Sequence, residues 1–288
     1  MDLGNVLTSK FPELGFYKEA LTTLEAQLNN TGANEYVELF YSLPCHENVI
    51  VLVSLMVFDF LVGKRTKARW FAVHAFANLL VVLAGFNAVV TALKDPLHAC
   101  DSAKYNDDSF GGDASRYPVI ITNSVHIYHM IAFKLTGADY FHHLLFLPTI
   151  GFAGQYYDWG AVSAFNGFFM SGLPGGLDYF ILVLVKHDVV SAMTQKHLCA
   201  CINVYLRGPA ILCVAMLLYI GVLYDFTTVP LYATIPIALL AAFNSLYYIK
   251  QSVANYSITH ALEHSNSMTF PIDKKLMKVI KAPQNNMC

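Results

Sequence analysis

Residues 118–157 read PVIITNSVHIYHMIAFKLTGADYFHHLLFLPTIGFAGQYY and place four histidines in two apolar stretches, 118–135 and 140–157. The histidines are His126, His129, His142 and His143. Each stretch approaches the roughly 20 residues that a helix needs to cross a bilayer. Ionisable side chains within a membrane span usually face the interior of the helix bundle and mark a site or a relay. The sequence therefore predicts a functional site on these two spans.

The composition indicates a membrane protein. Hydrophobic residues make up 56% of the 288 residues, charged residues only 13%, and the mean hydropathy is +0.46. Soluble domains carry about 25% charged residues, so a soluble domain of this length would leave much apolar surface uncovered. The formal net charge is −2 and no basic stripe is present, which argues against a nucleic-acid partner.

We therefore predict an all-α fold, a polytopic membrane helix bundle of about seven transmembrane helices. Every span is expected to be helical, because backbone amides in hydrocarbon find no water partner. The candidate spans are residues 48–63, 70–93, 118–135, 140–157, 160–186, 208–226 and 230–249. The first, third and fourth are short or polar, so six spans with one re-entrant segment is the alternative.

The distribution of basic residues supports seven spans. If the N-terminus lies outside the cytosol, 13 of the 18 lysines and arginines fall on the cytosolic side. Cytosolic loops are enriched in these residues. The predicted organisation is a lumenal N-terminal segment (1–47), a transmembrane domain (48–250) and a cytosolic basic tail (251–288). We expect the endoplasmic reticulum or a related secretory-pathway membrane.

Three features of the lumenal side bear on the topology. Asn29 opens an N-N-T glycosylation triplet, a pattern that also occurs by chance. Cys45 and Cys100 are both predicted lumenal, and a disulfide between them requires a proximity that sequence cannot show. The acidic loop 94–117 lacks calcium-loop spacing and is predicted to be a solvated connection.

The polar residues of four spans are predicted to share one layer of the membrane, near the cytosolic side. The set is His126, His129, His142, His143, Asp178 and Arg207. Ser171 begins the run SGLPGG (171–176), whose proline and glycines weaken a helix in the middle of a span. Irregular backbone at membrane depth usually lines a cavity. We therefore predict a cavity in this layer.

Each of these residues also has a purely structural interpretation. A single membrane histidine more often forms a hydrogen bond between helices than a catalytic site. Asp178 can pair with Arg207 or with a histidine, and His74 is predicted to be a packing residue. The segment HALEH (260–264) has two histidines at i,i+4, but its order is not H-E-x-x-H, so no metal site is predicted.

Residues 123–148, NSVHIYHMIAFKLTGADYFHHLLFLP, resemble the core of the TLC domain family of membrane proteins. In that core a span with a tyrosine and a polar group precedes a short loop and a His-His pair, which here are Tyr128 and His142-His143. Asp178-Tyr179 and NVYLR (203–207) resemble its later polar helix and arginine-bearing helix start. The resemblance covers roughly residues 48–250. The threonine that ceramide synthases carry three residues after the second histidine is Phe146 here, and of their H-D-x-S-D pattern only the last aspartate, Asp178, remains.

The chemistry that suits these residues is acyl transfer from acyl-CoA, as co-substrate, to the amine or hydroxyl of a membrane lipid. A neutral histidine can take a proton from the attacking group near pH 7. The expected roles are base for His142 or His143, orientation of that base for Asp178, a phosphate or carboxylate contact for Arg207, and substrate contacts for His126, Tyr128, His129 and Ser171. No bound cofactor or metal is expected, and a homodimer is open.

Two other classes of function stay open at this point. A non-catalytic lipid sensor, transporter or trafficking protein would use the same cavity only for binding. A seven-span zinc lipid hydrolase would hold three histidines around a metal within the membrane, and the position of HALEH (260–264) after the last span argues against it.

Overall fold

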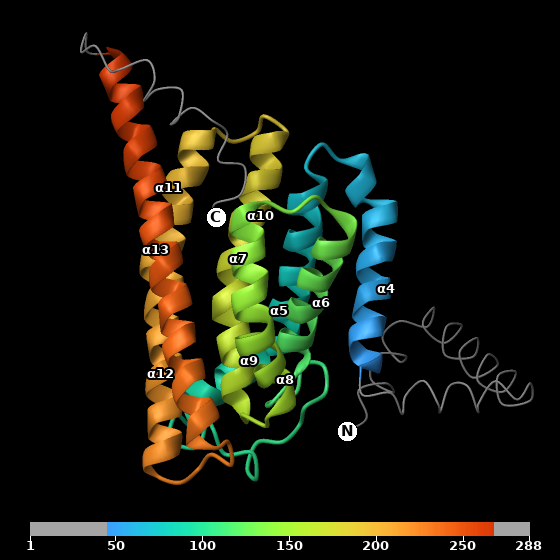
Figure 1. Cartoon of the computed structure of the whole chain (residues 1–288), viewed down its shortest axis with the longest axis vertical. Coiled ribbons are helices and arrows are strands. Elements are labelled where there is room, and N and C mark those ends of the chain that lie inside the picture. The colour runs from blue at the N-terminus through green and yellow to red at the C-terminus, as the bar shows by residue number, and fades with distance from the viewer. Residues whose placement is uncertain (1–44, 268–288) are drawn as a thin grey trace, which may run out of the picture. The chain divides into compact units, whose positions relative to one another are not determined.

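The computed structural model describes residues 45–267, apart from the side chains of Ala138 and of residues 264–267. The regular secondary structure of this part of the chain consists of helices, which confirms the predicted all-α fold (Figure 1). The chain divides into two units after Val49, and the helices that form the site belong to the unit that begins at Ile50. Asn29 and most of the predicted lumenal segment lie outside the described residues, as does the tail beyond residue 267.

Seven continuous helical segments follow one another in the described residues, and three of them contain a π-helical turn (η2, η3 or η4). The elements are α4 (His46–Leu61), η1 (Gly63–Arg65), α5 (Arg69–Lys94), α6 (Tyr117–Ala132), α7 (Gly137–Phe146), η2 (Leu147–Gly151), α8 (Phe152–Tyr156), α9 (Ala161–Gly167), η3 (Phe168–Gly172), α10 (Leu173–Lys186), α11 (Ala192–Ile202), η4 (Asn203–Arg207), α12 (Gly208–Leu223) and α13 (Leu231–Ser267).

Five helices are long and apolar enough to cross a membrane by length and composition. They are His46–Arg65, Arg69–Lys94, Ala161–Lys186, Ala192–Leu223 and Leu231–Glu263. Helix α6 has 16 residues, and neither α6 nor the segment from α7 to α8 meets the same criterion. Large apolar side chains such as Phe60, Leu83 and Leu239 stay more than half exposed, as expected for surfaces that face lipid. The seven spans remain a prediction.

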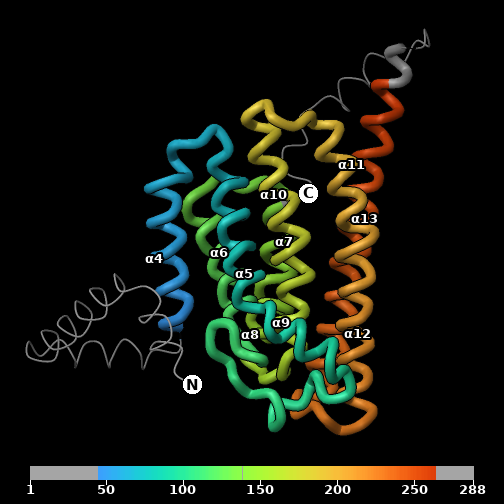
Figure 2. The backbone as a smooth tube through the Cα atoms, turned by 180° about the vertical axis from the view of Figure 1, so that it is seen from behind, coloured from blue at the N-terminus to red at the C-terminus, as the bar shows by residue number. Residues whose placement is uncertain are grey.

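Helix α5 is the centre of the packing (Figure 2). It contacts α6, α9 and α10, and its buried residues include Ala77, Ala84, Gly85 and Ala88. A Cβ atom at Gly85 would lie 3.3 Å from the Ala164 carbonyl oxygen. Small residues of this kind let helix backbones approach closely where the hydrophobic effect contributes little between helices. A second set of helix contacts is formed by α13, which packs along α11 and α12.

The helix that contains the SGLPGG run widens beside the predicted weakness, and two other helical segments widen near a proline. Pro174 and Pro209 each follow a π-helical turn, η3 and η4, by two residues, and Pro148 lies within η2. Proline lacks an N–H donor and its ring clashes with the carbonyl four residues earlier, and a wider turn accommodates both effects. The SGLPGG run therefore widens the helix that carries Ser171 without interrupting it.

Two predicted boundaries differ from the structure. Residues 187–207 lie between two predicted spans, 160–186 and 208–226, but the residues from Ala192 onward form α11, which continues through η4 into α12. Ser191 caps α11 by accepting a hydrogen bond from the Thr194 amide at 3.0 Å. Helix α13 extends past the predicted end at residue 249 to Ser267. Hydropathy marks where a helix leaves an apolar environment, whereas capping and helix packing decide where it ends.

The connections between helices gather at two opposite ends of this unit (Figures 1 and 2). Residues 62–68, 133–136 and 187–191 lie at one end, together with the far part of α13. Residues 95–116 and 224–230 lie at the other end. The first end carries Lys64, Arg65, Lys67, Arg69, Lys134 and Lys186, and we call it the basic end.

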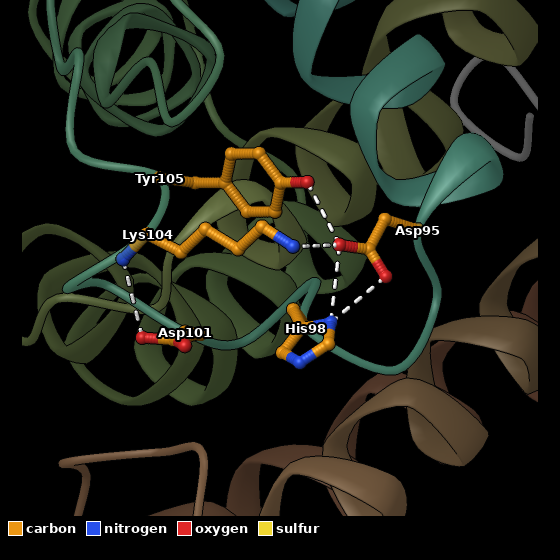
Figure 3. Close-up of polar contacts among 5 residues, drawn as sticks. All are labelled: Asp95, His98, Asp101, Lys104 and Tyr105. Atoms are coloured by element: carbon orange, nitrogen blue, oxygen red, sulfur yellow. Dashed lines mark hydrogen bonds and ion pairs between the residues drawn. The ribbon is translucent and has the colours of Figure 1, made fainter.

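Residues 95–116 form a folded connection around the carboxylate of Asp95 (Figure 3). The Asp95 carboxylate accepts hydrogen bonds from Lys104 Nζ at 2.5 Å, His98 Nδ1 at 2.9 Å and the Tyr105 hydroxyl at 2.9 Å. The ammonium of Lys104 and then the imidazole of His98 hold the pKa of the Asp95 carboxyl well below its usual range. No group of residues suited to a metal ion occurs here or elsewhere in the described residues.

The two cysteines considered for a disulfide are free thiols. Cys45 is exposed, whereas Cys100 is buried and its Sγ donates to the Leu217 carbonyl at 3.4 Å. Burial raises the pKa of the Cys100 thiol to about 12. A thiol with so little thiolate at neutral pH is a poor nucleophile.

We expect Asp95→Asn to loosen residues 95–116 at pH 7, because the amide loses the charge that holds Lys104. The pKa of Asp95 is lower in the folded protein than in the unfolded chain, so its stabilisation is present above about pH 4 and is lost as the pH falls further. Hydrogen exchange of the loop amides, corrected for intrinsic rates, should therefore differ between wild type and variant at pH 7 and converge in acid. Asp188→Asn, at the basic end, is the control; equal protection of wild type and Asp95→Asn at pH 7 would contradict the expectation.

Candidate functional site

A cavity of about 350 Å³ lies among the helices, in the half of the unit toward the basic end. Every predicted site residue except Tyr128 lines it: His126, His129, His142, His143, Ser171, Asp178 and Arg207. They come from α6, α7, η3, α10 and η4. The predicted cavity is therefore present, and it brings these side chains together from segments far apart in the sequence.

Five imidazoles form a cluster at the cavity. The ring centroid of His126 lies 5.0 Å from that of His142 and 5.1 Å from that of His143. The ring centroid of His129 lies 4.7 Å from that of His143. The fifth ring is His74 of α5, 5.5 Å from His129. His74 was predicted to be a packing residue, but it lines the cavity. Its Nδ1 donates to the Trp70 carbonyl at 2.9 Å.

A chain of hydrogen bonds connects α13 to α6 through the first histidine of the pair. The Tyr248 hydroxyl lies 3.0 Å from His142 Nδ1, and His142 Nε2 lies 2.9 Å from His126 Nε2. His126 Nδ1 lies 2.5 Å from the Thr122 carbonyl oxygen. Both ring nitrogens of His142 are therefore engaged by the protein.

His129 and His143 differ from His142 because they lack hydrogen-bond partners among the described residues. Their exposed fractions are 2% and 4%. His129 Nε2 and His143 Nδ1 are buried polar atoms without a partner. The His129 ring packs edge-on against Trp70, with the centroids 3.5 Å apart. A buried nitrogen without a partner costs free energy, so a molecule bound in the cavity can gain by satisfying these two rings.

Asp178 does not orient either member of the His-His pair, which corrects the role predicted for it. Its Oδ1 accepts a hydrogen bond from Gln195 Nε2 at 2.8 Å, and both side chains are 4% exposed. The hydrogen bonds of His142 go to Tyr248 and His126 instead. Sequence spacing placed Asp178 at the level of the histidines, with which it lines the cavity, but could not show its direction, which follows from the packing of α10 against α11.

Arg207 lines the cavity without an acidic partner among the described residues. Its Nη1 donates to Asn203 Oδ1 at 2.5 Å, one helical turn earlier, and its Nε is buried without a hydrogen bond. Its Cζ lies 5.8 Å from the centre of the Tyr248 ring, within the range of a cation–π contact. The ion pair with Asp178, open from the sequence, is not formed. A guanidinium without a carboxylate at this depth favours an anionic ligand.

Tyr128 faces away from the cavity, which corrects its predicted role in binding substrate. Its hydroxyl donates to Asp59 Oδ2 at 2.6 Å. Asp59 is 1% exposed and also accepts from Arg69, at 2.8 Å from Nε and 2.5 Å from Nη2. The bidentate ion pair of Asp59 with Arg69 joins α4 to α5, and the hydrogen bond from Tyr128 joins α6 to them. Tyr128 and His129 are neighbours on α6, and 100° of helix rotation separates a structural side chain from one at the cavity.

Ser171 lies where predicted, on the cavity wall. Its Oγ lies 3.0 Å from Thr122 Oγ1 and 3.1 Å from the Gly167 carbonyl, to which it donates. It links η3 to α6 beside the start of the histidine chain. Tyr248 and Gln195 are site residues that sequence reasoning missed, since neither belongs to a recognisable motif. The three π-helical turns all border the cavity, a location where such turns are frequent.

The sequence analysis considered a zinc site of three histidines within the membrane and a metal site at HALEH (260–264). Neither is present among the described residues. The five clustered imidazoles do not form a group able to hold a metal ion. His260 and Glu263 of the HALEH segment lie on the extended part of α13, away from the cavity lining, and both are exposed.

Comparison with family models, with curated proteins and with solved structures finds no match to this chain. The resemblance to the TLC domain therefore stays a prediction from residues 48–250.

We expect Tyr128→Phe to lower stability while leaving the cavity intact. The change removes a hydrogen bond to a buried carboxylate, worth about 1.5–3 kcal/mol. Thermal unfolding in detergent measures the loss of stability. Binding of a lipid that co-purifies with the protein shows whether the cavity is intact. Tyr219→Phe, on an exposed position of α12, is the control. Loss of lipid binding at unchanged stability would restore the binding role of Tyr128.

Proposed function

We propose that the chain is a seven-span membrane protein of the endoplasmic reticulum or a related secretory-pathway membrane, and that it transfers an acyl group from acyl-CoA to the amine or hydroxyl of a lipid bound in this cavity. The observation that carries the proposal is the convergence of His126, His129, His142 and His143 on one cavity between long apolar helices. Ionisable groups in such a position are costly and are usually functional.

The positions of the charged residues support this topology. Seven helical segments alternate in direction between the basic end and the end formed by residues 95–116 and 224–230. Cytosolic loops are enriched in lysine and arginine, so we assign the basic end to the cytosol and the N-terminus to the lumen. Acyl-CoA is a cytosolic anion. Lys186, Lys196 and Arg207 line the cavity and would attract its phosphates.

The size of the cavity bears on the ligand. A volume of about 350 Å³ is near the lower limit of ligand pockets. It suits the reacting part of a lipid together with a short length of chain better than a complete lipid with two chains. Apolar residues such as Phe146, Ile150 and Met170 line it together with the histidines.

The reaction needs one proton acceptor and one site for the acyl carbonyl. An imidazole takes the proton of the lipid amine or hydroxyl, the freed lone pair attacks the thioester carbon, and the thiolate of coenzyme A leaves and takes up a proton. His142 and His143 are the candidates for the acceptor. Asp178 lines the cavity and accepts a hydrogen bond from Gln195 rather than from either histidine of the pair.

We expect the double variant His142→Ala, His143→Ala to lose acyl transfer by about 10²-fold to 10⁴-fold, the usual contribution of general acid–base catalysis. Purified protein in lipid nanodiscs would be given radiolabelled palmitoyl-CoA and a total lipid extract, and labelled lipid products measured. His197→Ala, outside the cavity, is the matched control. Unchanged product formation by a correctly inserted double variant would remove the proposal.

A non-catalytic lipid binder is the second candidate, and one observation favours it. Neither histidine of the pair forms a hydrogen bond with a carboxylate of the described residues, so no acid orients a histidine base in the usual way. A lipid identified by mass spectrometry of the purified protein, together with no labelled product from palmitoyl-CoA, would establish binding without catalysis.

A further inference from the structure

The direction of each hydrogen bond in the chain from Tyr248 to Thr122 follows from one fixed point. The Thr122 carbonyl oxygen can only accept, so His126 Nδ1 carries a proton and donates to it. In a neutral imidazole the other nitrogen is then an acceptor. His126 Nε2 therefore accepts, and His142 Nε2 is the donor in the contact of 2.9 Å.

The same reasoning fixes the other end. His142 carries its proton on Nε2, so its Nδ1 accepts and the Tyr248 hydroxyl donates to it across 3.0 Å. Neutral rings are the expected state here, because the cluster is enclosed by helices and Arg207 already supplies a positive charge near Tyr248. All three hydrogen bonds consequently point from Tyr248 toward the α6 backbone.

The Tyr248 oxygen forms no further hydrogen bond with the described residues, and the residue lines the cavity. A hydroxyl that already donates its own proton can only accept from a bound molecule. The group of a bound ligand that best suits this oxygen is therefore an O–H or N–H donor. This property distinguishes Tyr248 from Thr122, at the other end of the chain, whose carbonyl is already an acceptor.

We propose that Tyr248 is the catalytic residue that takes the proton of the lipid nucleophile, and that His142 and His126 relay the charge into the protein. The proposal rests on the acyl transfer proposed above. It replaces direct transfer of the proton to His142 by transfer through the Tyr248 hydroxyl, and it gives His143 a contact to the acyl carbonyl instead of the role of proton acceptor.

The proton count of the relay balances. The lipid O–H or N–H bond breaks and its proton goes to the Tyr248 oxygen, while the original hydroxyl proton passes to His142 Nδ1. His142 releases its Nε2 proton to His126 Nε2. Tyr248 and His142 end neutral, and His126 ends as an imidazolium whose Nδ1–H still donates to the Thr122 carbonyl. A charged donor strengthens that hydrogen bond, so the stored proton has a prepared position. When the thiolate of coenzyme A leaves, the proton returns along the same chain and the Tyr248 hydroxyl passes a proton to the thiolate, which restores the neutral rings.

His143 is not part of this relay and can have a different role. Its ring lies 5.1 Å from that of His126 and 5.6 Å from that of His142, and it has no hydrogen bond to the described residues. It is therefore free to donate to the thioester carbonyl oxygen as negative charge develops there. This is the role that fixed hydrogen-bond donors serve in acyl transfer.

The first test measures the tautomers and needs no substrate. Full-length protein labelled with ¹⁵N-histidine would be studied by NMR in nanodiscs, with signals assigned by single-histidine variants. We expect the proton of His142 on Nε2 and that of His126 on Nδ1. In Tyr248→Phe the His142 Nδ1 signal should shift, because it loses its donor, whereas Tyr256→Phe should not change it. Tyr256 is on the same helix but packs on His197 outside the cavity. A proton on His142 Nδ1 in the unaltered protein would overturn the relay.

The second test measures turnover of radiolabelled palmitoyl-CoA. We expect Tyr248→Phe to lower kcat by about 100-fold or more with KM changed by less than about threefold, and Tyr256→Phe to match the unaltered protein. Groups that act as one unit are strongly non-additive, so Tyr248→Phe combined with His126→Gln should be no slower than the slower single variant. Multiplied losses, or an unchanged kcat in Tyr248→Phe, would overturn the proposal.

The two tests separate the relay from the function on which it rests. Absence of acyl transfer by the unaltered protein would remove the proposed function and the catalytic role of Tyr248 together. The tautomers would in that case still show whether the directional chain exists. Correct tautomers with active Tyr248→Phe would instead uphold the acyl transfer and remove only the relay.

Discussion

Polar groups between these apolar helices must find their partners within the protein, and the rest of the structure depends on this constraint. Backbone groups meet it by forming helices, which is why the described chain contains long helical segments and short connections. Asp59 meets it with Arg69 and Tyr128, so that one buried carboxylate joins α4, α5 and α6. Asp178 meets it with Gln195. Several buried atoms without a hydrogen bond to the described residues, among them His129 Nε2, His143 Nδ1 and Arg207 Nε, belong to side chains that line the same cavity.

The cavity itself follows from how the helices accommodate proline. A helix with a π-helical turn carries an extra residue in that turn, which shifts the side chains before and after it relative to each other. The turns η2, η3 and η4 occur near Pro148, Pro174 and Pro209, and each contributes residues to the cavity lining. The buried alanines of α5 and its Gly85 keep the helices close elsewhere. Tight packing and local widening thus coexist in one bundle.

The histidine cluster combines two kinds of imidazole. His126 and His142 have their nitrogens occupied in a fixed direction, whereas His129 and His143 have nitrogens that only a bound molecule can satisfy. Such a division separates proton transfer from ligand contact. Arg207 adds a positive charge beside Tyr248, which favours a ligand with negative charge, such as a thioester carrying phosphates.

The sequence by itself determined the helical class, the approximate positions of the apolar segments and the depth at which His126, His129, His142, His143, Asp178 and Arg207 would meet. These properties depend on hydropathy and on the fixed rise of a helix, both of which are local. The run SGLPGG likewise predicted a local irregularity, because the effect of proline is confined to its own turn.

Only the tertiary structure decided which side chains touch. Tyr128 points toward Asp59, whereas its neighbour His129 points toward the cavity. Asp178 forms its hydrogen bond with Gln195, and Tyr248 of α13 forms one with His142, 106 residues away. Helix rotation, the pairing of α10 with α11 and the packing of α13 against η2, which continues α7, set these contacts. Rotation and pairing depend on how all the helix surfaces fit together, and no local segment of the sequence contains that information.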